Sequence, residues 1–261
     1  MKRTDLLKIT LAQIDLTWEN PEENRRNIEN LLTRIPEKSD LIVLPETFST
    51  GFTTRDTLYA EPMDGPTVNW IRRLAKSTQM AICGTLLITE DHKTYNRFVF
   101  VTPDDQITYY DKRHIFSIGG ESTGLSKGND RVIINYLGWR IALYTCYDIR
   151  FPVWCRNQND TDLMIFSANW PDSRITVWDI LLKARAIENQ VFVAGVNRVG
   201  SDGNGISYPG NSQLVNPRGE ILPQQPYPNV ELLTFEISLK TLNEFRSKFP
   251  VANDSDHFVV G

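Results

Sequence analysis

The spacing of apolar and polar side chains along this chain changes between a period of two and a helical period, and so predicts strands and helices in turn. Residues 7–14 alternate apolar and polar positions, which is typical of a strand. Residues 20–23, Asn-Pro-Glu-Glu, supply the residue types of a helix N-terminus: a capping side chain, a proline in the first turn and an early glutamate. Ile28, Leu31, Leu32 and Ile35 then recur at helical spacing, and Pro36 is expected to end the helix. Residues 41–44 form a continuous apolar run, as in a strand covered on both faces.

The same alternation continues to the C-terminal end. Further strands are expected at 80–88, 95–101, 106–110, 131–134, 139–145, 163–166, 191–196, 212–215, 220–222 and 232–237, and further helices from Pro66 onward and at 153–157, 176–190 and 239–248. No linker or low-complexity tract interrupts this order. We therefore expect one α/β domain spanning residues 1–261, with a mixed system of sheets.

One candidate for chemistry lies at the end of a predicted strand. The apolar run 139–145 ends at Cys146, a polar turn follows, and Pro152 comes shortly after. Loops at strand ends of α/β sheets are frequent positions of catalytic groups, because the rigid sheet fixes where they point. A free cysteine is also among the most commonly buried residue types and usually behaves as a small hydrophobic side chain. The pattern alone leaves both a nucleophilic and a structural role open for Cys146.

A thiol nucleophile needs a base and a group that stabilises the oxyanion, and the sequence offers two sets of partners. Glu46 directly follows one predicted strand and Lys112 ends another. Each alone is the kind of charged residue that usually lies in solvent at a strand end, but together they supply a carboxylate base and an ammonium group. His114 is the alternative base, in a Cys–His dyad. His92 and His257 lie in polar segments, and we expect both in solvent.

Composition and charge argue against several classes of partner. The chain is 41% hydrophobic and 23% charged, its net charge is −4, and it has no basic stripe, so we expect no nucleic-acid partner. No stretch approaches the roughly 20 apolar residues of a membrane span, and the N-terminal residues lack the apolar core of a secretory signal. Three cysteines are too few, and odd in number, for a disulfide framework. We expect a reduced, cytoplasmic protein without membrane association.

Metal and nucleotide chemistry are not expected either. The sequence contains no His-Glu-x-x-His segment and no paired-cysteine motif, and its three histidines lie far apart. The glycine-rich segment 200–205 follows a strand, but it lacks the G-x-G-x-x-G spacing and no helical pattern comes after it. We therefore predict a turn there, and neither a metal nor a cofactor.

Three segments together resemble the nitrilase superfamily of carbon-nitrogen hydrolases. They are Leu44-Pro45-Glu46, Asp111-Lys112-Arg113-His114-Ile115-Phe116 and Cys146-Tyr147-Asp148-Ile149-Arg150-Phe151-Pro152. Residues 184–190 and 216–220 look like the helix and hairpin motifs of the same superfamily, so the resemblance covers essentially the whole chain. It implies a four-layer α-β-β-α sandwich of the nitrilase type, and a homodimer that pairs through helices.

The resemblance also implies a chemistry, which is similar to that of the bacterial omega-amidases. These hydrolyse the terminal amide of small 2-oxo dicarboxylic acid monoamides, such as 2-oxoglutaramate and 2-oxosuccinamate, to the acid and ammonia. Carried over by motif, Cys146 would be the nucleophile, Glu46 the general base and Lys112 the oxyanion stabiliser, assisted by the backbone N–H of Tyr147. A second glutamate of the family, in the loop after the lysine motif, would fall on Glu121.

The substrate's distal carboxylate would need a cation or N–H donors. Arg150, Arg174 and Arg198 are candidates, and the pair Asn169-Trp170 ends a predicted strand and is expected to line the pocket. A structural interpretation stands beside each: a solvated or ion-paired arginine, a core aromatic for Trp170, and a brace under the Cys146 turn for Asp148 and Arg150.

Two other functions stay open at this point. The same Glu-Lys-Cys residues could serve N-carbamoyl hydrolysis or acyl transfer, which a panel of amides assayed for ammonia would distinguish. The chain could also be an inactive scaffold or binding protein. Rapid, selective alkylation of Cys146 over Cys83 and Cys155 near neutral pH would argue against a scaffold, because a thiol of low pKa reacts in that way.

Overall fold

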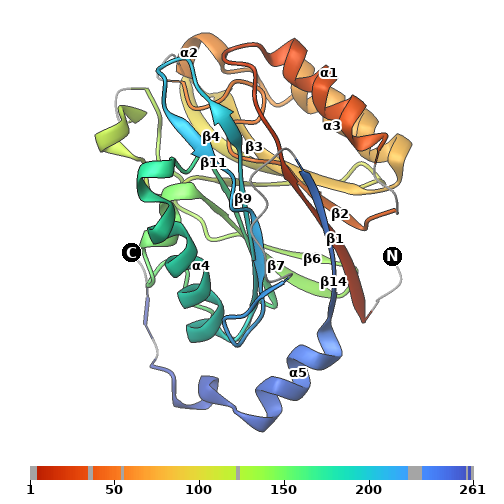
Figure 1. Cartoon of the computed structure of the whole chain (residues 1–261), viewed down its shortest axis with the longest axis vertical. Coiled ribbons are helices and arrows are strands. Elements are labelled where there is room, and N and C mark those ends of the chain that lie inside the picture. Colours follow the sequence, from red (N-terminus) through yellow and green to blue (C-terminus); the bar gives the residue numbers. More distant parts are fainter. Residues whose placement is uncertain are drawn as a thin grey trace.

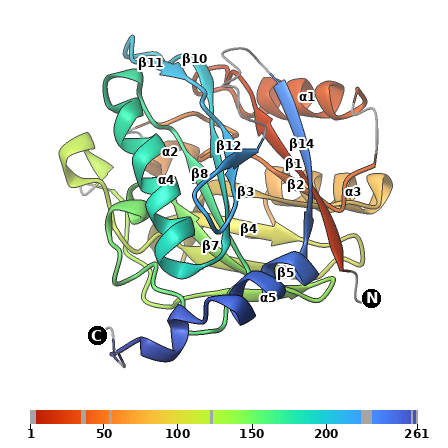
Figure 2. The same cartoon turned by 60° about the horizontal axis from the view of Figure 1, so that its bottom comes forward.

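Two six-stranded mixed sheets lie between helices in this chain (Figure 1). The computed structural model describes residues 5–34, 38–53, 56–121, 124–222, 231–256 and 258–259. Helices α1 and α3 lie side by side against one sheet and α4 lies on the opposite side of the molecule, as both views show (Figures 1 and 2). The predicted four-layer α-β-β-α order is therefore confirmed.

The first sheet has the strand order β14-β1-β2-β3-β4-β5. Its strands are β1 (Leu6–Gln13), β2 (Leu41–Val43), β3 (Ala81–Glu90), β4 (Lys93–Val101), β5 (Ile107–Asp111) and β14 (Glu231–Ser238). The three strands β1, β2 and β3 are parallel, and the others pair antiparallel at the edges. The C-terminal end of β2 therefore lies in the middle of the sheet, where neighbouring strands fix the residues that follow it.

The second sheet has the order β13-β12-β9-β8-β7-β6 and the same plan of a parallel centre with antiparallel edges. Its strands are β6 (Ile133–Tyr136), β7 (Trp139–Thr145), β8 (Leu163–Ala168), β9 (Phe192–Asn197), β12 (Gln213–Val215) and β13 (Ile221–Leu222). A separate two-stranded hairpin, β10 (Val199–Ser201) with β11 (Ser207–Pro209), follows β9.

The helices begin and end largely where local signals predict. They are α1 (Pro21–Leu32), α2 (Asp56–Tyr59), α3 (Pro66–Thr78), α4 (Ile175–Asn189) and α5 (Leu239–Lys248), with short 3-10 turns η1 (Ser117–Gly119), η3 (Cys146–Arg150), η4 (Asp172–Arg174) and η5 (Val251–Asp254). Asn20 caps α1 as predicted, because its Oδ1 accepts from the backbone N–H of Glu23 at 3.1 Å. None of these helices is long and apolar enough to cross a membrane.

The alternation within the strands decides which face packs where. In β1, Leu7, Ile9 and Leu11 belong to the core that contains both sheets, whereas Ala12 belongs to a second core with α1 and α3. A period of two places successive side chains on opposite faces, so one strand serves both layers. Both faces of the first sheet are thus covered, as its continuous apolar runs predict.

Two local predictions differ from the structure. The helix expected at 153–157 is absent: residues 152–155 form turns, and a 3-10 turn begins earlier, at Cys146. The Asp148 side chain accepts from the backbone N–H of Thr145 at 3.0 Å, which fixes the start of that turn, and Pro152 disfavours helix in the residue before it. The hairpin β10–β11 was predicted only as a turn, because its strands are too short to show a period.

Candidate active site

The chemically reactive side chains gather where strand ends of the two sheets meet. Glu46 follows β2, Lys112 follows β5, Cys146 follows β7 and Asn169 follows β8. The backbone N–H of Asn169 donates to Glu46 Oε2 at 2.9 Å, and its Nδ2 donates to the Glu46 carbonyl oxygen at 2.9 Å. These bonds connect a residue of the second sheet to one of the first, so the site depends on how the sheets pack.

Lys112 lies between two buried carboxylates. Its Nζ donates to Glu46 Oε1 at 2.9 Å and to both oxygens of Glu121 at 2.9 and 2.8 Å. Burial alone would lower the pKa of Lys112, but attraction to Glu121 and Glu46 outweighs it and raises the pKa above its ordinary value. The lysine is therefore a fixed ammonium ion whose charge only partly compensates two carboxylates.

Further donors hold these carboxylates in place. Asn96 Nδ2 donates to Glu46 Oε1 at 2.9 Å, and the backbone N–H of Phe116 donates to Glu121 Oε2 at 2.7 Å. The loop that carries Glu121 returns closely to the strand end, where a Cβ on Gly128 would lie 2.1 Å from the Asp111 carbonyl oxygen. Only a glycine fits at position 128 without moving the backbone of Asp111.

Cys146 is the first residue of η3 and has a φ of 41°, a left-handed conformation that a non-glycine residue rarely adopts. Burial raises the pKa of its thiol, the negative charge of Glu46 raises it further, and Lys112 opposes both only in part. The resting thiol is therefore protonated. Its deprotonation requires a base, and Glu46 is the carboxylate whose charge acts most strongly on the pKa of this thiol.

His114 is held away from this role. Its Nδ1 lies 2.8 Å from Asp148 Oδ1, and its ring stacks on that of Phe151 with centroids 3.6 Å apart. No contact with Cys146 is found among the described residues, so the geometry favours Glu46 over the Cys–His dyad. His92 is exposed in the turn between β3 and β4. His257 lies outside the described residues.

Asp148 braces the turn below Cys146, as one interpretation of the sequence predicts. Its buried carboxylate accepts from the Tyr110 hydroxyl at 2.7 Å and from the backbone N–H of His114 at 3.0 Å. It thereby ties the segment after β5 to the segment after β7. Arg150 is not part of this brace: its guanidinium lies over the ring of Trp170, 5.1 Å from the centroid.

A cavity of about 270 Å³ opens onto Lys112 and Cys146. The predicted residues Tyr147, Arg150, Asn169 and Trp170 all line it. The others are Phe52, Phe116, Ile118, Gly119, Pro171, Arg174, Asn204, Ile206 and Tyr208. Apart from Arg174, sequence reasoning missed this second group, because loops far apart in the chain contribute it and no local pattern marks them.

The three arginines proposed to bind a substrate carboxylate differ in location and in ion pairing. Arg150 and Arg174 line the cavity, and neither forms an ion pair within the described part of the chain. Arg198 is fully buried and donates to Asp15 Oδ1 at 2.7 Å and to the Leu16 carbonyl oxygen at 3.1 Å. Arg198 does not line the cavity, and its charge is already paired with Asp15, so the structure does not favour it as a substrate ligand.

Asn169 presents an unused acceptor at the same place. The residue is 6% exposed and lines the cavity, and its Oδ1 has no hydrogen-bond partner. The orientation of the amide group follows from its surroundings, since the Glu46 carbonyl oxygen can only accept and thus requires Nδ2 on its side. A buried free acceptor beside Glu46 suits an N–H donor from a bound amide.

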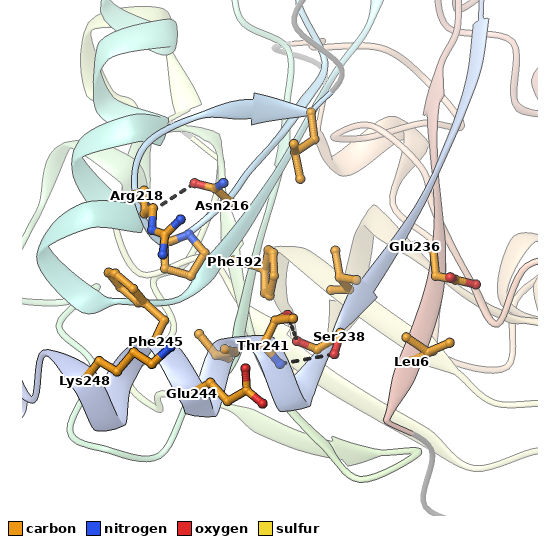
Figure 3. Close-up of a pocket in the computed structure, with 14 residues that line it drawn as sticks. Leu6, Phe192, Asn216, Arg218, Glu236, Ser238, Thr241, Glu244, Phe245 and Lys248 are labelled. Carbon is orange, nitrogen blue, oxygen red and sulfur yellow. Dashed lines mark hydrogen bonds between the residues drawn. The ribbon is translucent and has the colours of Figure 1, made fainter.

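A second hollow, of about 510 Å³, lies between α5, β14 and the β12–β13 turn (Figure 3). Arg218 lies over the ring of Phe245, 5.1 Å from its centroid, and Lys248 lines the same hollow. The described residues that line it include no thiol and no buried acid–base pair. Although this hollow is larger, its described lining residues offer no set comparable to Glu46, Lys112 and Cys146.

Selective labelling of Cys146 is expected because its thiol is accessible from the cavity, and not because its pKa is low. Burial raises the pKa of Cys83 and Cys155 as well, and both are fully buried, whereas Cys146 lines the cavity. We expect iodoacetamide to label Cys146 selectively, at a rate that rises with pH beyond the ordinary cysteine value of about 8.5, because the thiolate fraction keeps growing. Mass spectrometry measures this rate; a plateau near pH 7 would contradict the raised pKa of Cys146.

Comparison with known proteins agrees with this geometry. A family model described as Carbon-nitrogen hydrolase matches residues 8–247. Omega-amidase YafV of Escherichia coli strain K12 is 43% identical over 252 residues, which cover 97% of this chain and 98% of that protein. The 2-oxoglutaramate amidase of Bacillus subtilis strain 168 is 31% identical over 251 residues, 94% of this chain and 96% of that protein.

A solved structure is similar over the same length. It is the crystal structure of a CN-hydrolase superfamily protein from Xanthomonas campestris, with an arsenic adduct in its active site. It superposes with a TM-score of 0.95 at 42% identity, covering 99% of this chain and 100% of that one. The likeness therefore extends over both sheets.

Proposed function

The chain belongs to the carbon-nitrogen hydrolase family and is an amidase, and we propose that it hydrolyses the terminal amide of small 2-oxo dicarboxylic acid monoamides, such as 2-oxoglutaramate and 2-oxosuccinamate. The observation that supports this substrate class most directly is that the nucleophile and two guanidinium groups without an ion-pair partner among the described residues line the same cavity. Membership of an enzyme family with an intact Glu-Lys-Cys set makes the scaffold interpretation wrong.

Acylation begins with Glu46 and Cys146. Three donors already bind Glu46, two on Oε1 and one on Oε2, so Oε2 keeps more capacity to accept the thiol proton. As Glu46 removes that proton, sulfur forms a bond to the amide carbonyl carbon. The carbonyl oxygen becomes an oxyanion, which the Lys112 ammonium and the backbone N–H of Tyr147 stabilise.

Collapse of this intermediate breaks the C–N bond. Glu46 returns its proton to the departing nitrogen, ammonia leaves, and the acyl group remains on Cys146 as a thioester. The free Oδ1 of Asn169 accepts an N–H bond from the amide throughout this step. Water then attacks the thioester while Glu46 takes one of its protons, the C–S bond breaks, and the proton returns to sulfur.

Glu121 acts through Lys112. Both of its oxygens accept from Nζ, and it makes no described bond to Cys146. Its contribution is to hold the ammonium between the carboxylates, so that the charge points at the position of the oxyanion before the reaction begins. Preorganised charge of this kind in a buried site is usually the largest single contribution to catalysis.

The distal end of the substrate has two cationic partners. A carboxylate forms its strongest bonds with guanidinium groups that have no competing anion, and Arg150 and Arg174 meet that condition. Trp170 is mostly buried, packs against Trp178 at 5.4 Å between centroids, and supports Arg150 from below. Trp170 thus serves as both a core aromatic and a wall of the cavity.

A panel of amides assayed for ammonia tests the proposal. We expect hydrolysis of 2-oxoglutaramate and 2-oxosuccinamate to exceed that of N-carbamoyl amino acids and neutral amides of similar length. Preferred release from carbamoyl amino acids would support the alternative amidohydrolase, and acyl transfer to added hydroxylamine without free acid would support a transferase. Cys146→Ala is the control for background hydrolysis in every assay.

Replacing Arg150 with methionine should raise KM for the monoamides by about tenfold to a hundredfold, because a charge-assisted bond to the carboxylate is lost. Methionine keeps an apolar contact over Trp170. The KM for a neutral amide of the same length should change by less than about threefold. An equal effect on both substrates would show that Arg150 only supports the fold.

We also propose a homodimer that pairs through α4. Ile180 and Ile187 are 60% and 53% exposed, and their spacing of two turns places them in one stripe on the outer face of the helix. A helix that is apolar on both sides is typical of one covered on both sides. Sedimentation velocity should show a dimer, and Ile180→Arg should give a monomer; a monomeric parent protein would contradict the pairing.

A further inference from the structure

The hairpin β10–β11 supplies one wall of the cavity, although its sequence predicted only a turn. Asn204, Ile206 and Tyr208 all line the cavity together with Cys146. Tyr208 lies in β11, whereas Asn204 lies in the turn between the two strands and Ile206 directly precedes β11. The chemistry proposed above uses none of the three, so their presence in the wall needs its own explanation.

The carboxylate of Asp202 determines the shape of this loop. Its Oδ1 accepts from the backbone N–H groups of Asn204 and Ile206, both at 2.9 Å, and its Oδ2 accepts from the Tyr208 hydroxyl at 2.9 Å. The residue is 8% exposed. Burial and the charge of Asp202 raise the pKa of Tyr208, so the phenol keeps its proton and remains a donor. One buried side chain thereby fixes all three lining residues.

The base of the hairpin is anchored to the body of the protein. A Cβ on Gly200 would lie 2.2 Å from Asp15 Oδ1, and a Cβ on Gly203 would lie 2.4 Å from the Trp18 ring. Arg198 adds a bond to the Ser201 carbonyl oxygen at 3.3 Å. The hairpin also contacts η4, the turn that carries Arg174. These contacts fix the position of the hairpin relative to η4.

We propose that this hairpin is the chain-length determinant of the site, with Asp202 as its positioning residue. Ile206 limits the space beyond the acyl chain, and Asn204, whose side-chain amide has no partner within the described residues, binds the polar distal end next to Arg174. The inference rests on the proposed function, because it assumes that the acyl chain extends from Cys146 toward the hairpin. The hairpin, and not Glu46, Lys112 and Cys146, then determines which chain length of monoamide is preferred.

The test measures kcat/KM for monoamides that differ by one methylene group. We expect Ile206→Ala to shift the ratio between the longer and the shorter monoamide by about tenfold in favour of the longer one, since a methylene group in a pocket is worth about 10- to 200-fold. Asn204→Ala should lower kcat/KM for all the monoamides, mainly through KM. Asp202→Ala should flatten the preference, again through KM, because it releases the whole loop tip.

A matched control exists in the β12–β13 turn. Asn216 Oδ1 accepts from the backbone N–H groups of Arg218 and Glu220 at 2.9 and 3.1 Å, which is the same kind of bond in a hairpin that does not line the cavity (Figure 3). Asn216→Ala should leave the chain-length ratio unchanged. If it alters the ratio as much as Asp202→Ala does, the effect is general loosening and the proposal is overturned.

A further variant tests the proposal if Asp202→Ala does not fold. Tyr208→Phe removes only the hydroxyl bond to Asp202, so it replaces Asp202→Ala if that variant fails to fold, and it should shift the ratio in the same direction. An unchanged ratio in Ile206→Ala and Tyr208→Phe overturns the proposal. Failure of the proposed function would look different, since the parent protein would then release no ammonia from any monoamide.

Discussion

Replacing Cys146 with alanine will reduce ammonia release to background, a loss of about five to six orders of magnitude, as expected when a nucleophile is removed. No other thiol can take its place, because Cys83 and Cys155 are fully buried away from the cavity. The fold should be unaffected, since the thiol lies at the cavity wall and the turn below it is held by Asp148. Thermal unfolding and steady-state kinetics check both expectations.

Cys155 provides the matched control for this experiment. It is buried, and its Sγ donates to the Asp148 carbonyl oxygen at 3.3 Å. Cys155→Ala should therefore lower stability by about 1 kcal/mol while activity persists. The two variants together separate chemistry from folding. Activity above background in Cys146→Ala would remove this residue from the mechanism, whatever the stability of either variant.

Local sequence signals predicted the elements well where a period or a cap marks them. The bounds of β7 and α5 agree with their patterns, and the cap at Asn20 begins α1 as expected. Charged residues at the ends of β2 and β5 indicated a site, but these strands are not neighbours in the first sheet, and Cys146 comes from the second sheet, so their partnership depends on the tertiary fold. Resemblance to a known family supplied that information, and the geometry explains it.

The rest of the site could not be predicted for a physical reason. Asn169 contributes an acceptor only because its Nδ2 is held by the Glu46 carbonyl oxygen, a contact between residues far apart in the chain. Asp202 fixes one wall of the cavity through hydrogen bonds to the backbone that no hydrophobic periodicity in the sequence predicts. Arg198 resembled a ligand by residue type, yet its bond to Asp15 places it within the fold. Residue type cannot distinguish these cases; burial and partners can.

Replacing Lys112 with methionine will have the second largest effect, because it acts on catalysis and on stability together. Loss of an oxyanion donor costs about 10²–10³ in rate, and the loss should be larger here, since Lys112 is also the cation beside Glu46. The change leaves two buried carboxylates without their shared ammonium. Breaking a buried ion pair in this way costs about 3–5 kcal/mol.

The stability and rate effects can be separated by a second substitution. Glu121→Gln in the Lys112→Met background removes one of the unpaired charges, and the Phe116 N–H can still donate to the new amide oxygen. We expect this double variant to recover part of the lost unfolding free energy, because one buried carboxylate is cheaper to keep without a cation than two. Activity should not recover, since no ammonium faces the oxyanion.

The comparison decides between two roles for Lys112. If Lys112 served only to neutralise Glu46 and Glu121, restoring stability would restore turnover with it. If it stabilises the oxyanion, stability returns and turnover does not. Glu121→Gln alone completes the set: it keeps Lys112 and Glu46 paired at 2.9 Å and loses part of the hold on the ammonium. The loss of rate in Glu121→Gln should therefore be much smaller than that in Lys112→Met. Such a result would show that Glu121 acts by positioning Lys112 and not by direct contact with the thiol.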